Sequence, residues 1–248
     1  MTNLDTFSSD LNVVVIGANG GLGKGFIKAF EEDERVSSIY AFSRNKKDSI
    51  EKKVVSSFID LEDEDSIKKA AQLAGSKATV DLVIVATGVL HRGQSIKPEK
   101  SIRQIDPNVM IDVIKVNTVG PILVAKHFLP ILTKKRKTVF AALSARVGSI
   151  SDNRMGGWSS YRSSKAALNM LLKTASIELK FSSPQTIIVS LHPGTVDTRL
   201  SEPFKKNVTK KSLFDADFSA VKLINVLNTL NTSDTGRFFA WDGSSIEF

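Results

Sequence analysis

Tyr161 and Lys165 are the two residues whose types and spacing could carry chemistry. They begin a segment in which Leu168, Leu172 and Leu179 follow at helical spacing. Residues four positions apart lie on one face of a helix, so we expect the lysine one turn beyond the tyrosine on the same side. A nearby ammonium group favours the phenolate and so lowers the pKa of a tyrosine. A tyrosine adjusted in this way can give up or take a proton during catalysis.

The same spacing arises by chance in many helices, so its meaning depends on the elements that position it. Short β-branched runs alternate with helical patterns along the chain. We expect strands at residues 12–17, 38–43, 54–59, 81–86, 138–144, 186–192 and 237–241. We expect helices at residues 22–32, 63–74, 107–132, 161–180 and 216–230.

The inner strands, such as residues 13–16 and 82–85, are continuously apolar. Strands buried on both faces of a parallel sheet have this composition. We therefore expect a single α/β domain over residues 1–248. Its fold would be a doubly wound (Rossmann) parallel sheet of about seven strands with helices on both faces. The irregular stretches at residues 91–105, 147–160 and 193–214 follow strand ends, where such sheets bind ligands.

The first expected strand runs into a glycine-rich turn at residues 17–23. Such a turn lets the backbone approach a pyrophosphate, and the helix that follows offers free N–H groups and the positive end of its dipole. A tight turn that merely needs glycine is the alternative. Strand, glycines and helix nevertheless come in the order that a dinucleotide site requires, which favours cofactor binding. The residues expected to bind the cofactor here are Gly17, Asn19, Gly20, Gly21, Leu22 and Gly23.

The second expected strand ends at Ser43 and Arg44. An acidic residue at this place would bond the ribose hydroxyls and select NAD, whereas a small residue followed by arginine accommodates a 2′-phosphate. The sequence therefore favours NADP(H) over NAD(H), with Ser43 and Arg44 as the residues that distinguish them. An ordinary surface arginine is the alternative.

Polar residues also follow the next strands. Asp60, before Leu61, could accept a hydrogen bond from the adenine amino group or cap the following helix. Gly88, after Thr87, could let the backbone approach the cofactor ribose. Asn117 lies in an otherwise apolar segment, and a buried asparagine needs partners. It could satisfy backbone groups at a helix kink, hold a water in a proton relay, or do both.

Composition excludes several classes of function. The 34 basic residues exceed the 26 acidic ones, but they are scattered and accompany no nucleic-acid-binding motif. We therefore expect no nucleic-acid partner, although a basic surface could attract an anionic cofactor. The absence of cysteine rules out disulfides, thiolate zinc sites and a cysteine nucleophile.

The three histidines, His91, His127 and His192, show no metal-ligand spacing, so we interpret them as structural and expect no metal. Residues 1–10 lack the pattern of a signal peptide. No apolar run reaches the length expected of a membrane span. The sequence thus predicts a cytoplasmic protein without a membrane partner.

Taken together, these motifs resemble the short-chain dehydrogenase/reductase family along nearly the whole chain. The resemblance consists of the glycine turn, Asp60-Leu61, Thr87-Gly88, Asn117, a serine near position 144, Tyr161 with Lys165, and Pro193-Gly194 followed by Thr198. The runs at residues 144–150, 156–158, 164–169 and 241–243 are similar to the C-factor-like branch. Members of that branch are often named as cell–cell signalling proteins or carbonyl reductases.

The resemblance implies a role for each matching residue. Tyr161 would be the general acid–base, and Lys165 would bind the nicotinamide ribose and lower the tyrosine pKa. Ser144 would hydrogen-bond the substrate oxygen, and Asn117 would hold a relay water. The nicotinamide would be flanked by Pro193, Gly194, Val196 and Thr198. The loop at residues 199–213 would cover the substrate, and Trp158, Phe204, Leu213 and Phe214 suggest a partly apolar pocket.

Three departures from the family pattern stand out. Ile16 replaces the usual threonine before the first glycine, and Val85-Ala86 replaces an asparagine-rich strand end. The family commonly has Ser-Ser-x-x-Gly with the second serine catalytic, whereas here Ser144 is followed by Ala145. Neighbouring residues of a strand point to opposite faces, so Ser144 could point away from the substrate unless a bulge re-aims it. Ser149 is the next candidate.

The sequence as a whole favours an NADP(H)-dependent carbonyl reductase or alcohol dehydrogenase acting on a small-molecule carbonyl or alcohol. The alternative is a cofactor-binding, C-factor-like signalling protein with weak or no turnover, to which the Ala145 departure contributes. The family often forms homodimers or homotetramers through its long central helices, and residues 109–132 are apolar enough for that. Burial of these residues against the chain's own sheet would explain the same pattern.

Overall fold

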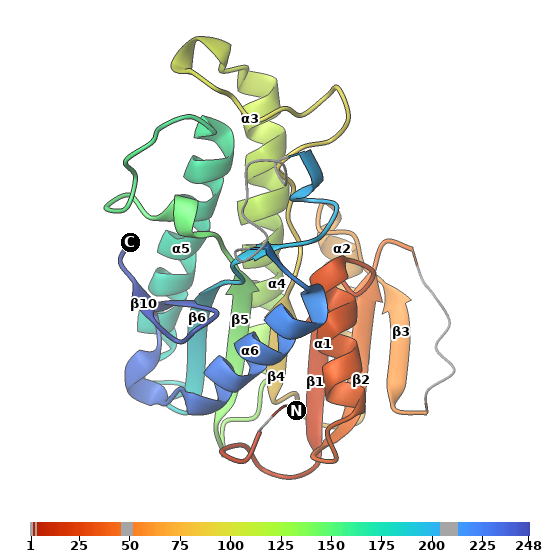
Figure 1. The fold of residues 1–248 in the computed structure, drawn as a ribbon. Coiled ribbons are helices and arrows are strands. Elements are labelled where there is room, and N and C mark those ends of the chain that lie inside the picture. Colours follow the sequence, from red (N-terminus) through yellow and green to blue (C-terminus); the bar gives the residue numbers. More distant parts are fainter. Residues whose placement is uncertain (1, 3, 46–51, 204–212) are drawn as a thin grey trace.

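The computed structural model describes residues 2, 4–45, 52–203 and 213–248. Its centre is a sheet in the order β10-β9-β6-β5-β4-β1-β2-β3 (Figure 1). The strands of this sheet are β1 (Leu11–Ile16), β2 (Val36–Ser43), β3 (Val54–Phe58), β4 (Leu82–Val85), β5 (Thr138–Leu143), β6 (Thr186–His192), β9 (Phe238–Ala240) and β10 (Ser245–Ile246). All neighbours pair in parallel except β10, which is antiparallel to β9. The doubly wound parallel sheet expected from the sequence is confirmed.

The sheet has one strand more than the expected number. The additional strand, β10, has 2 residues and contributes a single buried side chain, Ile246. So short a strand leaves no periodic pattern in the sequence. Another strand pair, β7 (Thr195–Val196) with β8 (Leu213–Phe214), forms a separate two-stranded sheet beside the main one.

Helices cover both faces of the sheet, as Figure 1 shows. On one face, α1 (Gly21–Glu31) and α6 (Ala216–Thr229) bury Phe26, Phe30 and Leu223 against odd-numbered residues of β1 and β5 and even-numbered residues of β4. On the other face, α2 (Glu64–Ala74), α4 (Gly120–Phe128) and α5 (Ser159–Leu179) bury a second core. The two cores explain why the inner strands are apolar throughout, since each strand contributes to both.

The long helix expected at residues 107–132 is not a uniform α-helix. It consists of α3 (Pro107–Ile114), the π-helical segment η2 (Lys115–Val119), α4 and a final 3₁₀ turn, η3 (Leu129–Ile131). The π turn places Asn117 and Thr118 inside the molecule. Apolar periodicity gives no sign of such a turn, because it changes the hydrogen bonding of the backbone and not the residue types.

The helical segment at residues 107–131 corrects the expectation that no apolar run is long enough to span a membrane. By length and composition, the continuous helical segment Pro107–Ile131 could cross a membrane. Its residues Val124, Phe128 and Leu129 instead belong to the core between α2, α5 and the sheet. Packing within the protein accounts for the apolar character of these residues.

The other elements agree with the expected ranges to within one or two residues at each end. The start of α5 differs in a way that matters for the site, because the helix begins at Ser159 rather than at Tyr161. The remaining 3₁₀ turns are η1 (Ile102–Gln104), η4 (Arg146–Gly148) and η7 (Thr232–Asp234). Phe204 and most of the loop at 199–213 lie outside the described residues.

Candidate active site

The site residues expected from the sequence gather at the carboxyl ends of the parallel strands. Ile16 pairs with both Phe42 and Val85, so the segments that follow β1, β2 and β4 leave the sheet at the same level. Leu143 pairs with Leu191 in the same way, which aligns the ends of β5 and β6. The chain turns in opposite directions from β1 and β4, and this is where open α/β sheets bind ligands.

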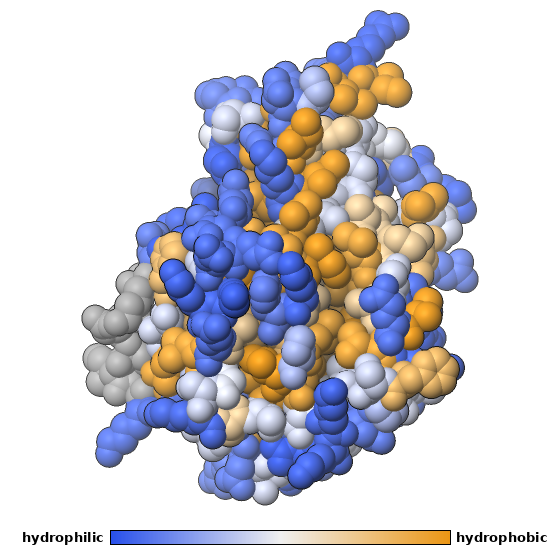
Figure 2. Space-filling view, turned by 180° about the vertical axis from the view of Figure 1, so that it is seen from behind, coloured by the Kyte–Doolittle hydropathy of each residue, from blue (hydrophilic) through white to orange (hydrophobic). Residues whose placement is uncertain are grey.

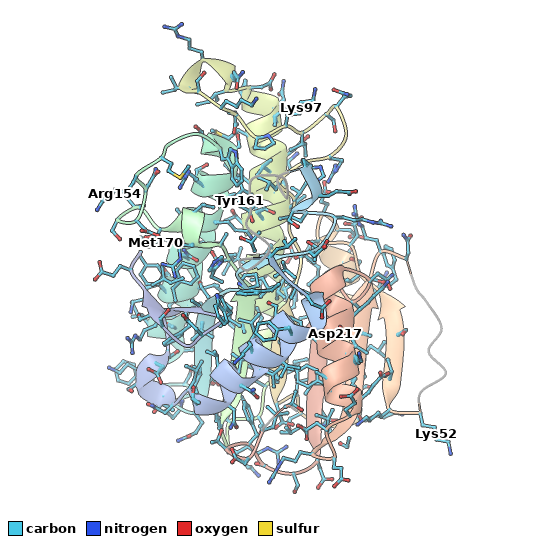
Figure 3. All side chains as sticks on the ribbon, viewed as in Figure 1. Lys52, Lys97, Arg154, Tyr161, Met170 and Asp217 are labelled. Carbon is cyan, nitrogen blue, oxygen red and sulfur yellow. The ribbon has the colours of Figure 1, made fainter. Side chains whose placement is uncertain are left out.

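Tyr161 and Lys165 project from the first two turns of α5 into this region. Figure 3 shows Tyr161 in the interior, at the end of the molecule toward which the strands run. Their side chains are buried, and Lys165 Nζ lies 5.9 Å from the centre of the tyrosine ring. Lys165 Nζ also donates a hydrogen bond of 2.7 Å to the carbonyl oxygen of Leu143, the last residue of β5. The helical spacing expected from the sequence thus places the pair together on the face toward the sheet.

The electrostatics of this pair differ from the expectation. Burial raises the pKa of Tyr161 above its ordinary value and lowers the pKa of Lys165 to about 7. Both shifts favour the uncharged form of a group removed from water. The expected lowering of the tyrosine pKa by a lysine cation is therefore not what this arrangement produces, because burial shifts the pKa of both groups toward the neutral form.

Asn117 comes from η2 and is fully buried beside the same pair. Its Oδ1 accepts from Val89 N at 2.7 Å, and its Nδ2 donates to Val89 O at 2.8 Å and to Ser164 Oγ at 3.0 Å. The side chain thus ties the segment after β4 to α5. Gly88 lies between these groups, since a Cβ built on it would be 3.4 Å from Asn117 Oδ1 and 3.6 Å from Lys165 Nζ. A side chain at position 88 would fill the space in front of the lysine.

Ser144 follows β5 and continues the alternation of that strand. Phe140 and Ala142 face α5, and Ser144 has the same parity, so it lies on the α5 side while Ala145 lies on the opposite side. Ser144 Oγ is buried and has no hydrogen-bond partner among the described residues. Ser149, the second candidate, accepts a hydrogen bond from Asp152 N at 3.1 Å and pairs with Ser151 Oγ at 3.2 Å.

The glycine-rich turn has the shape that a pyrophosphate requires. Gly17 adopts a φ of +90°, and a Cβ on it would lie 2.8 Å from Ala86 O. A Cβ on Gly23 would overlap Gly17 O, so the turn can close against the helix only with glycine at both places. The N-cap residue of α1 is Gly20, and no described side chain caps this helix end. Thr87 Oγ1 beside the turn is buried and unpaired among the described residues. These features fit a dinucleotide.

Two of the residues expected around the adenosine, Ser43 and Arg44, lie beside this turn. Asn19 Nδ2 donates to Ser43 Oγ at 2.8 Å, which links the glycine turn to the end of β2, and Arg44 is exposed next to it. Asp60 is not the cap of α2, because Asp63 fills that position by accepting from Asp65 N. The Asp60 carboxylate accepts only the local hydrogen bond from Glu62 N at 3.1 Å among the described residues.

Beyond β6, Pro193 and Gly194 lead into β7. Pro193 O accepts from Ser219 Oγ at 2.7 Å, and Gly194 has a φ of +80° beneath the rings of Phe214 and Trp241. Val196 is buried in β7. Thr198 lies against Gly21, since a Cβ built there would be 2.6 Å from the Thr198 methyl group. The segment after β6 therefore reaches across the sheet edge to the glycine turn.

Two residues of this region were not among those expected from the sequence to act in the site. Glu99, from the loop after β4, is 4% exposed and contacts the start of α5. His192 ends β6 one residue after Leu191, which pairs with Leu143 of β5, and its Nδ1 is buried and unpaired among the described residues. Burial and the positive charge of Arg146 lower the pKa of His192 to about 4. A lone acidic residue or histidine in a sequence carries no spacing signal by which these positions could have been found.

Comparison with known proteins agrees with this geometry. The family model for short chain dehydrogenase matches residues 11–209, and the chain belongs to this family. An uncharacterised oxidoreductase of Schizosaccharomyces pombe is 26% identical over 94% of this chain and 96% of its own length. C-signal of Myxococcus xanthus is 33% identical over 53% of this chain and 74% of its own length.

Among solved structures, the NADPH-bound carbonyl reductase from chicken fatty liver superimposes with a TM-score of 0.83. It is 26% identical, and the match covers 98% of this chain and 96% of that one. The protein described here is thus a short-chain NAD(P)-dependent oxidoreductase, similar to carbonyl reductases in structure.

Proposed function

We propose that this protein is an NADPH-dependent reductase of small aldehydes or ketones, and that the same site can run the reverse oxidation of the alcohol. The observation that carries the proposal is the buried Tyr161–Lys165 pair beside Asn117 and Gly88, at the strand ends next to a glycine turn. The cofactor, when bound, supplies or accepts a hydride at its nicotinamide. A cytoplasmic location accords with an enzyme of this kind.

In this mechanism Tyr161 gives its phenolic proton to the carbonyl oxygen of the substrate as the carbon receives hydride. The raised pKa of Tyr161 keeps the phenol protonated, as an acid in the reducing direction must be. Lys165 is held at the end of β5 by its bond to Leu143 O and would bind the nicotinamide ribose. Asn117 links Val89 to Ser164 by hydrogen bonds and could support a relay water.

We assign the remaining cofactor contacts as the sequence indicates. Gly17, Gly21, Gly23 and the N-terminus of α1 would hold the pyrophosphate, and Asp60 with Leu61 would lie beside the adenine. Ser43 and Arg44 would hold the 2′-phosphate, for which the NADPH bound to the chicken enzyme is a parallel. Pro193, Gly194, Val196 and Thr198 would lie along the nicotinamide.

Ser144 keeps the proposed role of donor to the substrate oxygen. Its hydroxyl lies just after β5 and is buried without a hydrogen-bond partner among the described residues. A substrate oxygen would therefore reach it only after a shift of the segment at residues 144–146. A Ser144→Ala variant tests this role, since a large loss of kcat at unchanged affinity for NADPH is expected if the hydroxyl contacts the reacting oxygen.

The test of the proposed function is turnover by the Tyr161→Phe variant. Removing the hydroxyl should abolish reduction of an aldehyde and ketone panel, while NADPH still quenches tryptophan fluorescence with nearly unchanged affinity. Retained turnover would contradict the assignment of Tyr161. Absence of both turnover and NADPH binding in the wild type would contradict the enzyme hypothesis.

The second candidate is a cofactor-binding signalling protein with weak or no turnover. The similarity to C-signal and the alanine at position 145 favour it. The two candidates differ in one measurement, because a signalling protein would bind NADPH without reducing any member of the panel.

We also propose that two copies of this chain associate. Figure 2 shows a band of apolar side chains along the face opposite to α1 and α6. On the helices of that side, Ile111, Val119, Met170 and Ile177 are each at least 42% exposed. Ile122, Leu129, Ala175 and Leu179 line a hollow of about 460 Å³ between α4 and α5. A second copy would cover this surface. Single exposed apolar residues are normal on a monomer, but a continuous apolar surface of this kind usually marks a protein–protein interface.

A further inference from the structure

A buried carboxylate lies in the irregular loop between β4 and α3. Glu99 is 4% exposed, although Lys97 and Lys100 beside it point into solvent. The loop is anchored by Ile96, which packs with Val89 and Val113. Figure 3 shows Lys97 at the same end of the molecule as Tyr161. A carboxylate removed from water must be compensated by hydrogen bonds or by charge, so its partners show what it does.

All the hydrogen bonds of Glu99 that the structure gives go to the start of α5. Ser160 N donates to the two carboxylate oxygens at 3.3 and 3.2 Å. The hydroxyl of Ser160 donates to Oε1 as well. The main-chain oxygen of Glu99 accepts from Trp158 N at 2.6 Å. The loop thus holds the residues immediately before Tyr161 through both its backbone and its side chain.

The first turn of α5 needs a hydrogen-bond acceptor from outside the helix, because its own N-cap side chain cannot supply one. The first N–H groups of a helix have no partner within the helix, and an oxygen on the N-cap side chain usually accepts from one of them. Here the N-cap residue is Trp158, in a left-handed conformation with φ 54°. An indole has a donor and no acceptor oxygen, so it cannot cap the helix. Glu99 supplies the missing acceptor, and its negative charge suits the positive end of the helix dipole.

The turn before the helix is fixed from its other side as well. Arg162 donates from Nε to Gly157 O at 2.9 Å, and from its two terminal nitrogens to Val147 O and Gly156 O at 3.2 Å each. Tyr161 is therefore placed between one residue held by Glu99 and another that holds the preceding turn. Its ring also meets the Trp158 ring edge-on, with centres 6.4 Å apart.

We propose that Glu99 is a positioning residue for Tyr161: its carboxylate fixes the first turn of α5 and with it the place of the phenolic hydroxyl. The inference rests on the proposed role of Tyr161 as acid–base. Displacing a reacting group by about 1 Å can cost about 100-fold in rate. Glu99 makes no contact with the glycine turn among the described residues, so its removal should affect the chemical step and leave cofactor affinity nearly unchanged.

The experiment compares Glu99→Ala with Glu99→Gln. In Glu99→Ala we expect kcat for carbonyl reduction to fall by about 10- to 100-fold, with the Kd for NADPH within about twofold of the wild type. Glu99→Gln keeps the shape and an acceptor oxygen, so kcat should recover to within about fivefold. Ser160→Ala should lower kcat in the wild type but not further in Glu99→Ala, because the two residues act through one contact.

Asp106→Ala is the matched control. Asp106 caps α3 by accepting from Asn108 N and Val109 N, in the loop that also carries Glu99. Its removal should lower the Tm and leave kcat unchanged. Wild-type kcat in Glu99→Ala would overturn the inference. So would a parallel fall of kcat, NADPH affinity and Tm that Asp106→Ala reproduces.

A second measurement is independent of turnover. Amide hydrogen exchange at Ser160 and Tyr161 should accelerate in Glu99→Ala relative to the middle of α5, with or without cofactor. Unchanged exchange would also overturn the inference. Failure of the proposed function would show differently, as retained turnover in Tyr161→Phe while exchange in Glu99→Ala is still accelerated.

Discussion

At the scale of single residues, the side chains of Tyr161 and Lys165, which are proposed to take part in proton transfer, are both buried away from water. Burial favours a neutral lysine as well as a neutral tyrosine, so Lys165 is close to the midpoint of its titration at neutral pH. Free lysine would be fully charged under the same conditions. The protonation of Lys165, rather than that of Tyr161, is therefore the property that pH changes most near pH 7.

This leads to a prediction for cofactor binding. The ammonium form of Lys165 is the better donor to ribose hydroxyls, so the Kd should rise as pH increases through about 7 and the cation is lost. We expect a slope of at most about tenfold per pH unit between pH 7 and 9. NADH is the cofactor to titrate by calorimetry, because it lacks the 2′-phosphate whose own ionisation changes near pH 6.

Lys165→Met provides the control, since it keeps much of the apolar stem without the ionisable group. Its Kd should be higher and independent of pH over this range. An equal slope in wild type and variant would show that another group is responsible.

A second residue-scale prediction concerns cofactor preference. Arg44 is exposed beside Ser43 at the end of β2, where a 2′-phosphate would lie. Arg44→Asp replaces a cation by a carboxylate that repels the phosphate and can accept from ribose hydroxyls. Losing a charge-assisted hydrogen bond of about 1.5–3 kcal/mol corresponds to a roughly 10- to 100-fold weaker Kd for NADPH.

The Kd for NADH should fall or stay constant in Arg44→Asp, and Lys24→Ala on the nearby exposed face of α1 serves as a charge control. Equal losses for the two cofactors would mean that Arg44 contributes only general attraction. No change for either would make it an ordinary surface arginine.

At the scale of elements, the site depends on how the strands are fixed at their other ends. Asp81, just before β4, is fully buried. Its carboxylate accepts from Asn12 N at 3.0 Å and from Arg136 Nε at 2.7 Å. It therefore joins β1, β4 and the segment before β5, the strands whose far ends carry Gly17, Gly88 and Ser144.

Arg136→Ala should consequently destabilise the protein by about 1.5–3 kcal/mol, because it removes a hydrogen bond from a cation to the buried Asp81 carboxylate. Urea unfolding monitored by circular dichroism measures this free energy. The exposed pair Lys28–Asp217 is a suitable comparison, and Lys28→Ala should have little effect because solvent screens both charges. Similar unfolding midpoints for the two variants would contradict a special role of the Asp81–Arg136 pair.

The π-helical turn is the second element that the site requires. In a regular α-helix the residues after Ile114 would be rotated differently, and Asn117 would not point between Val89 and Ser164. The turn thus sets the position of a side chain that the family resemblance identified and that the periodicity of the segment could not orient.

At the scale of the whole molecule, the two faces of the sheet differ in what covers them. The surface over α4 and α5 carries apolar side chains that are not buried in the protein's own core (Figure 2). Phe181, just after α5, is 90% exposed. A surface of this kind is expected to bind another protein surface. The proposal of two associated copies follows from this distribution.

Sedimentation velocity tests this proposal, with an expected mass of about twice the 27.0 kDa of one chain. Ile177→Asp should shift the protein to the single-chain mass, because it places a charge within the apolar surface. Phe58→Asp, an exposed residue of β3 at the sheet edge, should not. A wild type that sediments as a single chain would contradict the proposal.

The fold class and most residues of the candidate site could be predicted from the amino-acid sequence alone. Continuous apolar runs alternating with helical patterns define a doubly wound sheet, and Gly17, Tyr161 and Lys165 carry spacings that depend only on local geometry. These features can be predicted without the tertiary structure because each depends on residues within one strand, one turn or one helix.

Properties that depend on contacts between distant segments could be established only from the folded structure. The pKa directions of Tyr161 and Lys165 follow from burial, which a sequence does not specify. The side to which Ser144 points follows from the face of β5 that α5 covers. The contact of Glu99 with Ser160 joins residues 61 positions apart, and no local pattern connects them.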